Sequence, residues 1–369
     1  MEDILKREEM DMYSLTPPTS LDIDRELEEI IKKHNARIKV VGVGGGGGNT
    51  VSRMHEIGIK GGEIIAINTD AQDLLYARAD QKILIGREIS RGLGAGSNPQ
   101  IGREAAREQI TEIKKKLSNS DMVFVTCGLG GGTGTGAAPI VAEVAKSMGA
   151  LVIGVVTLPF TVEGAKRIEN AMEGLERMES IADTLIVIPN DKLLELAPEL
   201  PLPTAFKVAD EILTNAVKGI TELITSSGLV NLDFADIKAV MANGGVSLIG
   251  VGESDATDRV SDAVDKALNN PLLDVDIKDA QGALINVIGG NNLALEEYNQ
   301  AVKLIGEKLS PTAKLISGAR ISPDMDKSIK IMVIITGVKS PQISGERVSI
   351  DEVRRKDIES ELGIEFFET

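Results

Sequence analysis

Two glycine-rich segments carry the residues of this chain that are best suited to bind phosphate. The first is GGGGGN at 44–49 and the second is GGGTGTG at 130–136, and each stands between an apolar run and a helical pattern. Backbone N–H groups at such a turn, followed by a helix N-terminus, form an anion site that needs no lysine. Two such sites on neighbouring strands suit a longer phosphate chain than that of a dinucleotide.

Further residues near these segments fit the same chemistry. Thr133 and Thr135 add hydroxyl donors to the second segment. A third glycine segment at 92–96 precedes a helix start, where it could close over a terminal phosphate. The pattern G-x-x-x-x-G-K-[ST] occurs nowhere, so the P-loop mechanism with its lysine is excluded.

A weaker pattern overlaps the first segment and supports a different class of protein. Gly42, Gly44 and Gly47 satisfy G-x-G-x-x-G, and Asp70 follows about twenty residues later, as in dinucleotide-binding proteins. An NAD(P)-dependent Rossmann dehydrogenase would use these residues but would leave GGGTGTG without a role. Binding of nicotinamide nucleotides is the test of this reading.

The composition excludes several classes of protein. The chain has 369 residues, enough for two or three domains at roughly 150 residues each. Its net charge of −16 argues against a general affinity for nucleic acid or for anionic membrane, because both need clustered positive charge. No apolar run approaches the ~18 residues of a membrane span, and one cysteine excludes an internal disulfide. We expect a cytoplasmic protein with no direct membrane insertion and no nucleic-acid partner.

The elements that must position the glycine segments alternate between strands and helices. Apolar runs predict strands at 38–43, 63–67, 82–85, 122–126, 151–156 and 184–188, and helical spacing occurs at 50–57, 101–117, 137–148 and 163–178. Near-continuous Val/Ile strands separated by helices indicate a parallel sheet covered on both faces. We therefore expect an α/β, doubly wound domain with its ligand at the carboxyl ends of the strands.

The pattern changes in the second half of the chain. Helical spacing over roughly six turns at 203–226 predicts a long helix buried between two domains. Strands predicted at 246–251, 283–289, 313–321 and 329–336, with helices at 261–268 and 295–309, indicate a smaller mixed α+β domain. The predicted organisation is an N-terminal extension at 1–36, a nucleotide-binding domain at 37–202, a central helix and linker at 203–230, a C-terminal domain at 231–338 and a flexible tail at 339–369.

Three motifs together resemble the FtsZ family of tubulin-like cell-division GTPases. They are GGGGGN at 44–49, GGGTGTG at 130–136 and NLDFAD at 231–236, and the resemblance covers nearly the whole chain between its two tails. It implies that the first domain binds GTP or GDP and that the C-terminal domain activates GTP hydrolysis. The two tails look more archaeal than bacterial.

The resemblance also implies a cellular role. The chain would polymerise head-to-tail with copies of itself into the protofilaments of the division ring at mid-cell. Its tail at 339–369 would bind a membrane-adaptor protein of the division machinery. A tubulin-like GTPase acting in cell shape or plasmid partition is the alternative within the same fold.

The nucleotide-binding residues implied by the resemblance lie in the glycine segments and at the strand ends. They are Gly45, Gly46, Gly47, Gly48, Asn49, Asn68, Asp70, Ala95, Gly96, Gly130, Gly131, Gly132, Thr133, Gly134, Thr135, Gly136, Glu163, Arg167, Asn190, Phe206 and Asp210. Glu163 and Arg167 would face the ribose and the phosphates, although a surface ion pair one helical turn apart is the other reading.

Phe206 and Asp210 are four residues apart and therefore share one face of the long helix. By the resemblance, Phe206 stacks on the base, although packing in the core is the usual role of a phenylalanine. Asp210 suits guanine, whose N1–H and 2-amino group present two donors to one carboxylate, whereas a solvated helix position is its alternative.

The catalytic residues are expected outside the glycine segments. Hydrolysis of GTP needs an oriented water and neutralised charge on the transferred phosphoryl group. Asn231, Asp233 and Asp236 in NLDFAD can position that water, although a helix N-cap with acidic residues is the other reading. By the resemblance, this acidic segment (231–236) enters the nucleotide site of the next subunit, and such a heterologous contact makes filaments.

Mg²⁺ is the expected metal, because it binds triphosphate oxygens and water. Asn68 and Asp70 are the candidates to bind its water ligands, and no direct protein ligand is assigned.

Overall fold

The computed structural model describes residues 36–59, 61–196, 202–225, 230, 232–270, 277–278, 280–322 and 325–338. The predicted extension up to residue 35, the tail at 339–369 and Asn231 lie outside these described residues.

The described strands form one ten-stranded sheet in the order β3-β2-β1-β4-β5-β6-β7-β10-β8-β9. The strands are β1 (Ile38–Val43), β2 (Gly62–Asn68), β3 (Gln81–Leu84), β4 (Met122–Gly128), β5 (Leu151–Leu158), β6 (Thr184–Pro189), β7 (Gly245–Ser254), β8 (Gly282–Gly289), β9 (Lys314–Ile321) and β10 (Ile329–Thr336). Every strand predicted from an apolar run is present, with ends that differ by a few residues.

The first six strands are parallel, as predicted. Val41 in β1 pairs with Ile65 in β2 and with Val125 in β4, and all three side chains are fully buried. Helices cover both faces of such a sheet, which is why its strands are apolar on both sides. The order reverses between β1 and β4, and ligands of doubly wound folds bind at that point, beyond the carboxyl ends of the strands.

The second half continues the same sheet with mixed strand directions. β7 is parallel to β6 over three residue pairs, from Thr184 with Gly245 to Ile186 with Ser247. β10 runs antiparallel between β7 and β8, and β9 is parallel to β8. The predicted mixed sheet is confirmed, and it extends the first sheet edge to edge.

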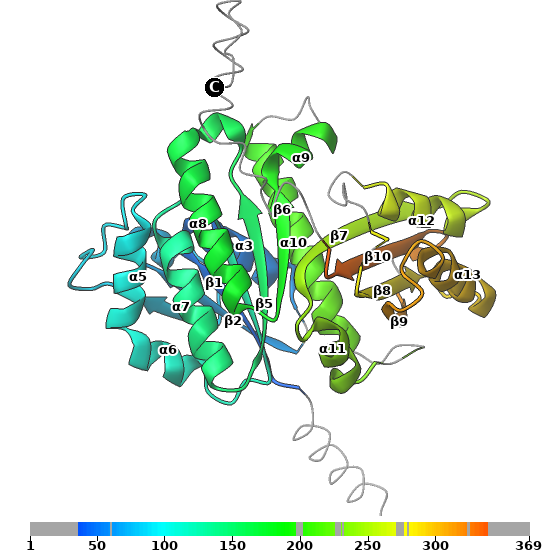
Figure 1. Cartoon of the computed structure of the whole chain (residues 1–369), viewed down its shortest axis with the longest axis horizontal. Coiled ribbons are helices and arrows are strands. Elements are labelled where there is room, and N and C mark those ends of the chain that lie inside the picture. The colour runs from blue at the N-terminus through cyan, green and yellow to red at the C-terminus, as the bar shows by residue number, and fades with distance from the viewer. Residues whose placement is uncertain are drawn as a thin grey trace, which may run out of the picture. The chain divides into compact units, whose positions relative to one another are not determined.

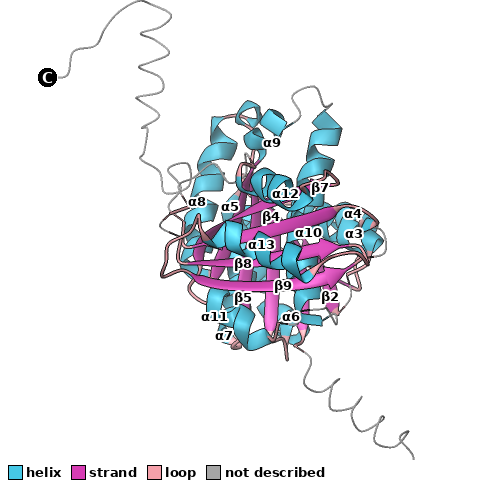
Figure 2. Cartoon of the chain, turned by 90° about the vertical axis from the view of Figure 1, so that its right-hand side faces the viewer, coloured by secondary structure: helices cyan, strands magenta, loops and turns pink. Residues whose placement is uncertain are grey.

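The helices pack on this sheet in groups. They are α3 (Gly44–Ile57), α4 (Ala71–Tyr76), α5 (Pro99–Glu108), α6 (Ile110–Leu117), α7 (Thr133–Ser147), α8 (Ala165–Ile181), α9 (Asn190–Leu196), α10 (Leu202–Thr225), α11 (Phe234–Met241), α12 (Arg259–Leu268) and α13 (Leu295–Gly306), with a 3₁₀ turn, η1, at Thr161–Glu163. α7 contacts α5, α6 and α8, whereas α3 contacts α10 (Figure 1). α12 and α13 contact each other and the strands of the second half (Figure 2).

Two helix boundaries differ from the prediction in an informative way. α3 begins at Gly44 and α7 at Thr133, so most of each glycine segment is the first turn of a helix and not a separate loop. Glycine has the weakest helix propensity after proline, and this hides a helical turn from a reading based on spacing.

The prediction of one continuous helix at 101–117 is wrong. The chain leaves helical geometry at Gln109, which has φ −100° and ψ 22°, and α6 starts at the next residue. The side-chain oxygen of Gln109 accepts a hydrogen bond from the backbone N–H of Gly86. This contact with a distant loop fixes the break.

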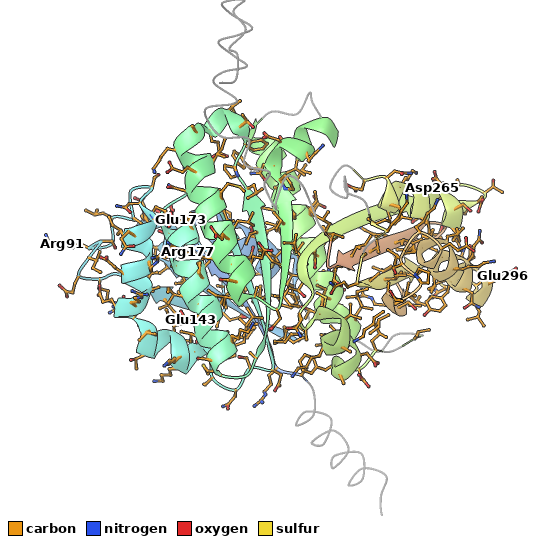
Figure 3. All side chains as sticks on the ribbon, viewed as in Figure 1. Arg91, Glu143, Glu173, Arg177, Asp265 and Glu296 are labelled. Atoms are coloured by element: carbon orange, nitrogen blue, oxygen red, sulfur yellow. The ribbon has the colours of Figure 1, made fainter. Side chains whose placement is uncertain are left out.

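Ion pairs on the outer surface of α8 tie it to its neighbours. Glu173 pairs with Arg177 one turn later (Figure 3). Its carboxylate also lies 4.0 Å from the guanidinium of Arg103 in α5. None of the helices among the described residues is long and apolar enough to span a membrane.

Candidate nucleotide-binding site

A pocket of about 500 Å³ lies at the switch point of the sheet, beyond the carboxyl ends of β1 and β4. Fifteen of the predicted residues line it: Gly45, Gly46, Asn49, Asn68, Asp70, Ala95, Gly131, Gly132, Thr133, Gly134, Glu163, Arg167, Asn190, Phe206 and Asp210. These residues come from segments far apart in the sequence, and the fold brings them to one place.

The two glycine segments are packed against each other at the floor of this pocket. A Cβ atom on Gly44 would lie 2.8 Å from the backbone nitrogen of Gly134, and Gly44 has a positive φ of 74°. A Cβ atom on Gly46 would lie 3.2 Å from the backbone nitrogen of Gly128. Several glycines are therefore needed for contact between the two helix starts. Gly131, by contrast, lines the pocket and has nothing within 4 Å of its Cβ position, which leaves room for a ligand.

Six predicted residues do not line the pocket: Gly47, Gly48, Gly96, Gly130, Thr135 and Gly136. Thr135 is buried, and its hydroxyl oxygen accepts a hydrogen bond of 2.9 Å from the backbone N–H of Gly130. Gly136 meets the backbone of Pro99, whose oxygen lies 1.9 Å from the Cβ position, so it allows α5 and α7 to approach. These residues shape the turn behind the pocket wall.

Gly48 lines a neighbouring cavity of about 290 Å³ between α3 and α4. That cavity shares Gly45, Asn49, Asn68 and Asp73 with the main pocket. The main pocket holds the two glycine segments, the aromatic ring and the carboxylates together, and it is therefore the candidate nucleotide site.

A buried pair of hydroxyl groups joins the second glycine segment to the turn after β2. Thr69 Oγ1 lies 2.6 Å from Thr133 Oγ1, and both side chains are buried. The backbone oxygen of Thr69 also accepts a hydrogen bond from the N–H of Gly94, in the segment before α5. The hydroxyl of Ser90 lies 3.2 Å from the same oxygen and 2.9 Å from the backbone oxygen of Gly86, so its one proton is shared between them. Thr69 was missed from the sequence, although it stands between the predicted Asn68 and Asp70.

The same turn supplies oxygen atoms suited to a hard cation. Asp70 caps α4, with its Oδ1 accepting from the N–H groups of Gln72 and Asp73 at 2.9 and 3.1 Å. The carboxylate of Asp73, another residue missed from the sequence, lies 3.4 Å from the Cβ position of Gly45. Within the described residues no group of three or more His, Cys, Asp or Glu could hold a metal ion. The oxygen atoms of Asn68, Asp70 and Asp73 that line the pocket are of the kind that hard cations such as Mg²⁺ bind together with phosphate oxygens and water.

Glu163 and Arg167 form the predicted ion pair and also line the pocket. Glu163 Oε2 pairs with Arg167, and its Oε1 accepts a 2.9 Å hydrogen bond from the N–H of Phe160. The guanidinium of Arg167 is half exposed, at 47%. The ion-pair reading is confirmed, and the pair also lines the pocket. Contact of these two side chains with the ribose and the phosphates stays a prediction.

The other end of the pocket offers an aromatic face and an unpaired amide. Phe206 is 41% exposed, and its ring packs edge-to-face on the buried ring of Phe160, with centroids 5.3 Å apart. Asn190 is 5% exposed, and its buried Oδ1 has no hydrogen-bond partner among the described residues. Buried polar atoms are normally paired, so this oxygen marks a place where a polar ligand or water belongs.

Asp210 presents a carboxylate to the same end of the pocket. Its Oδ1 accepts a 2.7 Å hydrogen bond from the hydroxyl of Thr50. Burial raises the pKa of Asp210, while the hydrogen bond from Thr50 and the charge of Arg53 lower it, and burial is the largest cause. Thr50 lines the pocket and was also missed, because no local pattern links it to a residue 160 positions away.

The acidic segment lies at the opposite end of the sheet from this pocket. α10 passes the pocket at Asp210 and ends at Thr225, about 22 Å further on at 1.5 Å per residue. α11 follows, and the oxygen of Met241 in α11 accepts a hydrogen bond from Thr184, the first residue of β6. The pocket residue Asn190 directly follows the last residue of that strand. α9 and α11 accordingly lie at opposite ends in both views (Figures 1 and 2).

Asp233 and Asp236 are exposed and cap the start of α11. The N–H of Asp236 donates to Asp233 Oδ1 at 2.7 Å, and the N–H of Asp233 donates to Asp236 Oδ2 at 3.4 Å. The N-cap reading of these residues is confirmed. Neither residue lines the pocket of its own chain.

Comparison with known proteins gives consistent relatives for both halves of the chain. The model of the Tubulin/FtsZ family, GTPase domain, matches residues 37–198, and that of the FtsZ family, C-terminal domain, matches residues 245–339. Cell division protein FtsZ 1 of Thermococcus kodakarensis is 58% identical over 92% of this chain and 92% of its own length. The corresponding protein of Methanocaldococcus jannaschii is 54% identical, again over 92% of both chains.

Solved structures agree with these relatives. An empty FtsZ dimer of M. jannaschii superposes with a TM-score of 0.82 at 56% identity, covering 85% of this chain and 92% of that one. CetZ1 from Haloferax volcanii, a GDP-bound monomer, superposes with a TM-score of 0.73 at 26% identity, covering 88% and 99%. Both family models match in order, and more than half of the residues are identical to these relatives over nine-tenths of the sequence. The chain therefore belongs to the FtsZ family, the cell-division branch of the tubulin-like GTPases.

Proposed function

We propose that this chain binds GTP and GDP in the pocket at the switch point and hydrolyses GTP at a head-to-tail contact between two copies. The observation that supports the proposal is that the pocket and the acidic segment lie at opposite ends of the molecule. The glycine segments and Asp210 stand at the carboxyl ends of the strands, whereas Asp233 and Asp236 stand at the other end of the same molecule. Family membership removes the dehydrogenase reading, which gave the second glycine segment no role.

Within the pocket, each group has a place along the nucleotide. The amides of the two helix starts and the hydroxyl of Thr133 bind the phosphates, because helix N-termini favour anions. Arg167 supplies a full positive charge near them. The exposed face of Phe206 stacks on the base, and Asn190 with Asp210 accepts hydrogen bonds from its edge.

Mg²⁺ would neutralise charge on the β- and γ-phosphates when it is bound. Asn68 and Asp70 would hold its water ligands, and the carboxylate of Asp73 stands close to the same place. Their oxygen chemistry supports this assignment, since Mg²⁺ is usually bound by one or two carboxylates together with substrate phosphates.

Hydrolysis needs a second copy of the chain. The acidic segment of one subunit would reach the γ-phosphate in the pocket of the next, where Asp233, Asp236 and Asn231 orient the attacking water. A contact between opposite ends of two identical subunits does not close on itself, so repetition gives a filament. Bound GTP stabilises that contact through its γ-phosphate, and hydrolysis weakens it.

We infer that these filaments build the division ring under the membrane at mid-cell, in the cytoplasm. Identity of 58% to a cell division protein FtsZ 1, over 92% of both chains, favours division over the alternative roles in cell shape or plasmid partition. The tail at 339–369 is proposed to bind the membrane adaptor.

Mixing two inactive variants tests the shared site. Asp210→Ala should prevent guanine binding, and Asp236→Ala should abolish turnover while GTP binding stays nearly intact. In an equal mixture, about a quarter of the contacts pair an intact pocket with an intact acidic segment, so turnover should recover to about that share. Asp262→Ala, which removes an exposed acidic residue from the first turn of α12, is the matched control and should keep full turnover.

The cap at the start of α11 needs its own control. Asp236→Ala removes a capping contact as well as a charge, at a cost of about 1 kcal/mol of stability. Asp236→Asn keeps an acceptor for the N–H of Asp233 and removes the charge, and it should be equally inactive. If the mixture recovers no turnover at any mixing ratio, that result would contradict a site shared between subunits.

A further inference from the structure

The carboxylate assigned to the base is held in place by a side chain from another helix. The hydroxyl of Thr50 in α3 lies 2.7 Å from Oδ1 of Asp210 in α10, and the two helices are in contact. Thr50 is only 1% exposed, so its position is fixed by packing on all sides.

The hydroxyl of Thr50 has one hydrogen and two acceptors within reach. The backbone oxygen of Gly46, one turn earlier, lies 3.1 Å away, and Asp210 Oδ1 lies closer at 2.7 Å. Hydrogen bonds to ionised acceptors are the shorter and stronger ones, so the proton belongs to the contact with Asp210. This bond fixes the rotation of the carboxylate about its terminal torsion, and it leaves Oδ2 and the second lone pair of Oδ1 free to accept from a ligand.

Little else orients this carboxylate. Among the residues that the structure describes, Asp210 makes no salt bridge, and Arg53 acts on it only through its charge. The terminal torsion of aspartate is broad and roughly two-fold, so an unheld carboxylate samples many orientations. A pair of donors on one base edge is recognised well only when both oxygens face it together.

We propose that Thr50 is a positioning residue for base selection, which aligns Asp210 so that its carboxylate accepts from both N1–H and the 2-amino group of guanine. This assignment rests on the proposed binding of GTP and GDP. Its specific consequence concerns hypoxanthine, which keeps the N1–H donor and lacks the 2-amino group. A carboxylate that is free to rotate can still accept the one hydrogen bond from N1–H of hypoxanthine. It loses the alignment that lets it accept both hydrogen bonds from guanine, so the preference for guanine falls.

The test uses Thr50→Val, which keeps the shape of the side chain without its hydroxyl, and Thr50→Ser, which keeps the hydroxyl. Dissociation constants of GDP, IDP and ADP are measured by calorimetry on the full chain, together with the unfolding temperature of each nucleotide-free variant. We expect Thr50→Val to reduce the preference for GDP over IDP by about three- to tenfold, in the range of one hydrogen bond. Thr50→Ser should keep the wild-type preference within about twofold.

The outcomes separate the two levels of the proposal. If Thr50→Val weakens GDP and IDP equally, or if Thr50→Ser loses the preference as well, Thr50 acts only in packing and the assignment is overturned. A wild-type chain that binds no guanine nucleotide would overturn the proposed function itself, and the role of Thr50 with it. A lower unfolding temperature with an unchanged GDP-to-IDP ratio also counts against base selection.

Discussion

Thr69, in the turn after β2, and Thr133, the first residue of α7, are in contact through their buried hydroxyl groups, which lie 2.6 Å apart. When Thr133 donates its proton to a phosphate oxygen, it must accept from Thr69. The backbone oxygen of Thr69 in turn holds the segment before α5 through Ser90 and Gly94. The hydroxyl that we propose to bind phosphate is therefore positioned by a neighbour that never needs to touch the ligand.

The first prediction concerns this hydroxyl. Thr133→Ala should weaken contacts with the γ-phosphate by roughly 1–2 kcal/mol, in the range of hydrogen bonds to charged groups. The preference for GTP over GDP, measured by competition binding, should fall accordingly. Thr133→Ser keeps the hydroxyl and should behave like the wild type. An unchanged preference in Thr133→Ala would mean that this side chain serves only the turn.

Phe206 gives a prediction about the base. Phe206 is 41% exposed, so its removal should lower the stability of the fold only slightly but weaken nucleotide binding strongly. Stacking of a base on an aromatic ring contributes roughly 1–3 kcal/mol, so Phe206→Ala should weaken GDP about 5- to 150-fold.

Phe206→Tyr is the control, since it keeps the aromatic face. Calorimetric titration of both variants with GDP checks the expectation. Equal affinity of Phe206→Ala and the wild type would place the base elsewhere in the pocket.

A third prediction follows from the burial of Asp210, which raises its pKa. The carboxylate accepts from guanine only when it is ionised. The affinity for GDP should therefore fall as the pH is lowered through this raised pKa, at a higher pH than for an ordinary exposed aspartate. Titrations with GDP across a pH series measure this, and Asp210→Asn should bind GDP weakly and lose the pH dependence.

The raised pKa of Asp210 has the opposite effect on the stability of the nucleotide-free protein, which should fall as the pH rises. A carboxyl whose pKa is raised by folding favours the fold while it is neutral, and that contribution is lost as the pH rises through the raised pKa. Asp210→Asn should accordingly raise the unfolding temperature of the nucleotide-free chain at neutral pH. A lower unfolding temperature would show that the ionised carboxylate stabilises the fold through Thr50.

Much of this site could be predicted from the sequence, because a glycine run between a strand and a helix brings backbone N–H groups close to a bound anion. Gly131 and Asp70 lie where the pattern placed them. The missed residues depend on contacts across long distances in the chain. Thr50 acts on a residue 160 positions later, and Thr69 on one 64 positions later, so neither has a local pattern.

For the fold as well, features set by local sequence were predicted and features set by distant contacts were missed. Strand runs were predicted well, because burial on both faces makes a strand apolar along its whole length. The helix break at Gln109 was not predicted, since it depends on a hydrogen bond from the N–H of Gly86, which is distant in the sequence. The single continuous sheet was missed for a similar reason: edge pairing of β6 with β7 leaves no mark on either strand alone.

The fourth prediction concerns the tail. Val338 is 5% exposed, and its N–H donates to the oxygen of Val246 in β7, so a truncation should leave this residue in place. Removal of residues 339–369 should spare GTP hydrolysis and polymerisation and disturb attachment to the membrane. Sedimentation with GTP and imaging of the tagged protein in cells check the two parts. Loss of polymerisation would make the tail part of the filament.

The most direct test of the shared site is GTP turnover per subunit as a function of protein concentration, with Mg²⁺ in excess. Since Asp233 and Asp236 lie at the opposite end of the sheet from the pocket, we propose that an isolated subunit has no complete active site. We predict almost no turnover at low concentration. Above a critical concentration the total rate should rise linearly, so that the rate per subunit climbs toward a plateau. A rate per subunit that stays constant down to nanomolar protein would contradict this account, because each monomer would then carry a whole active site.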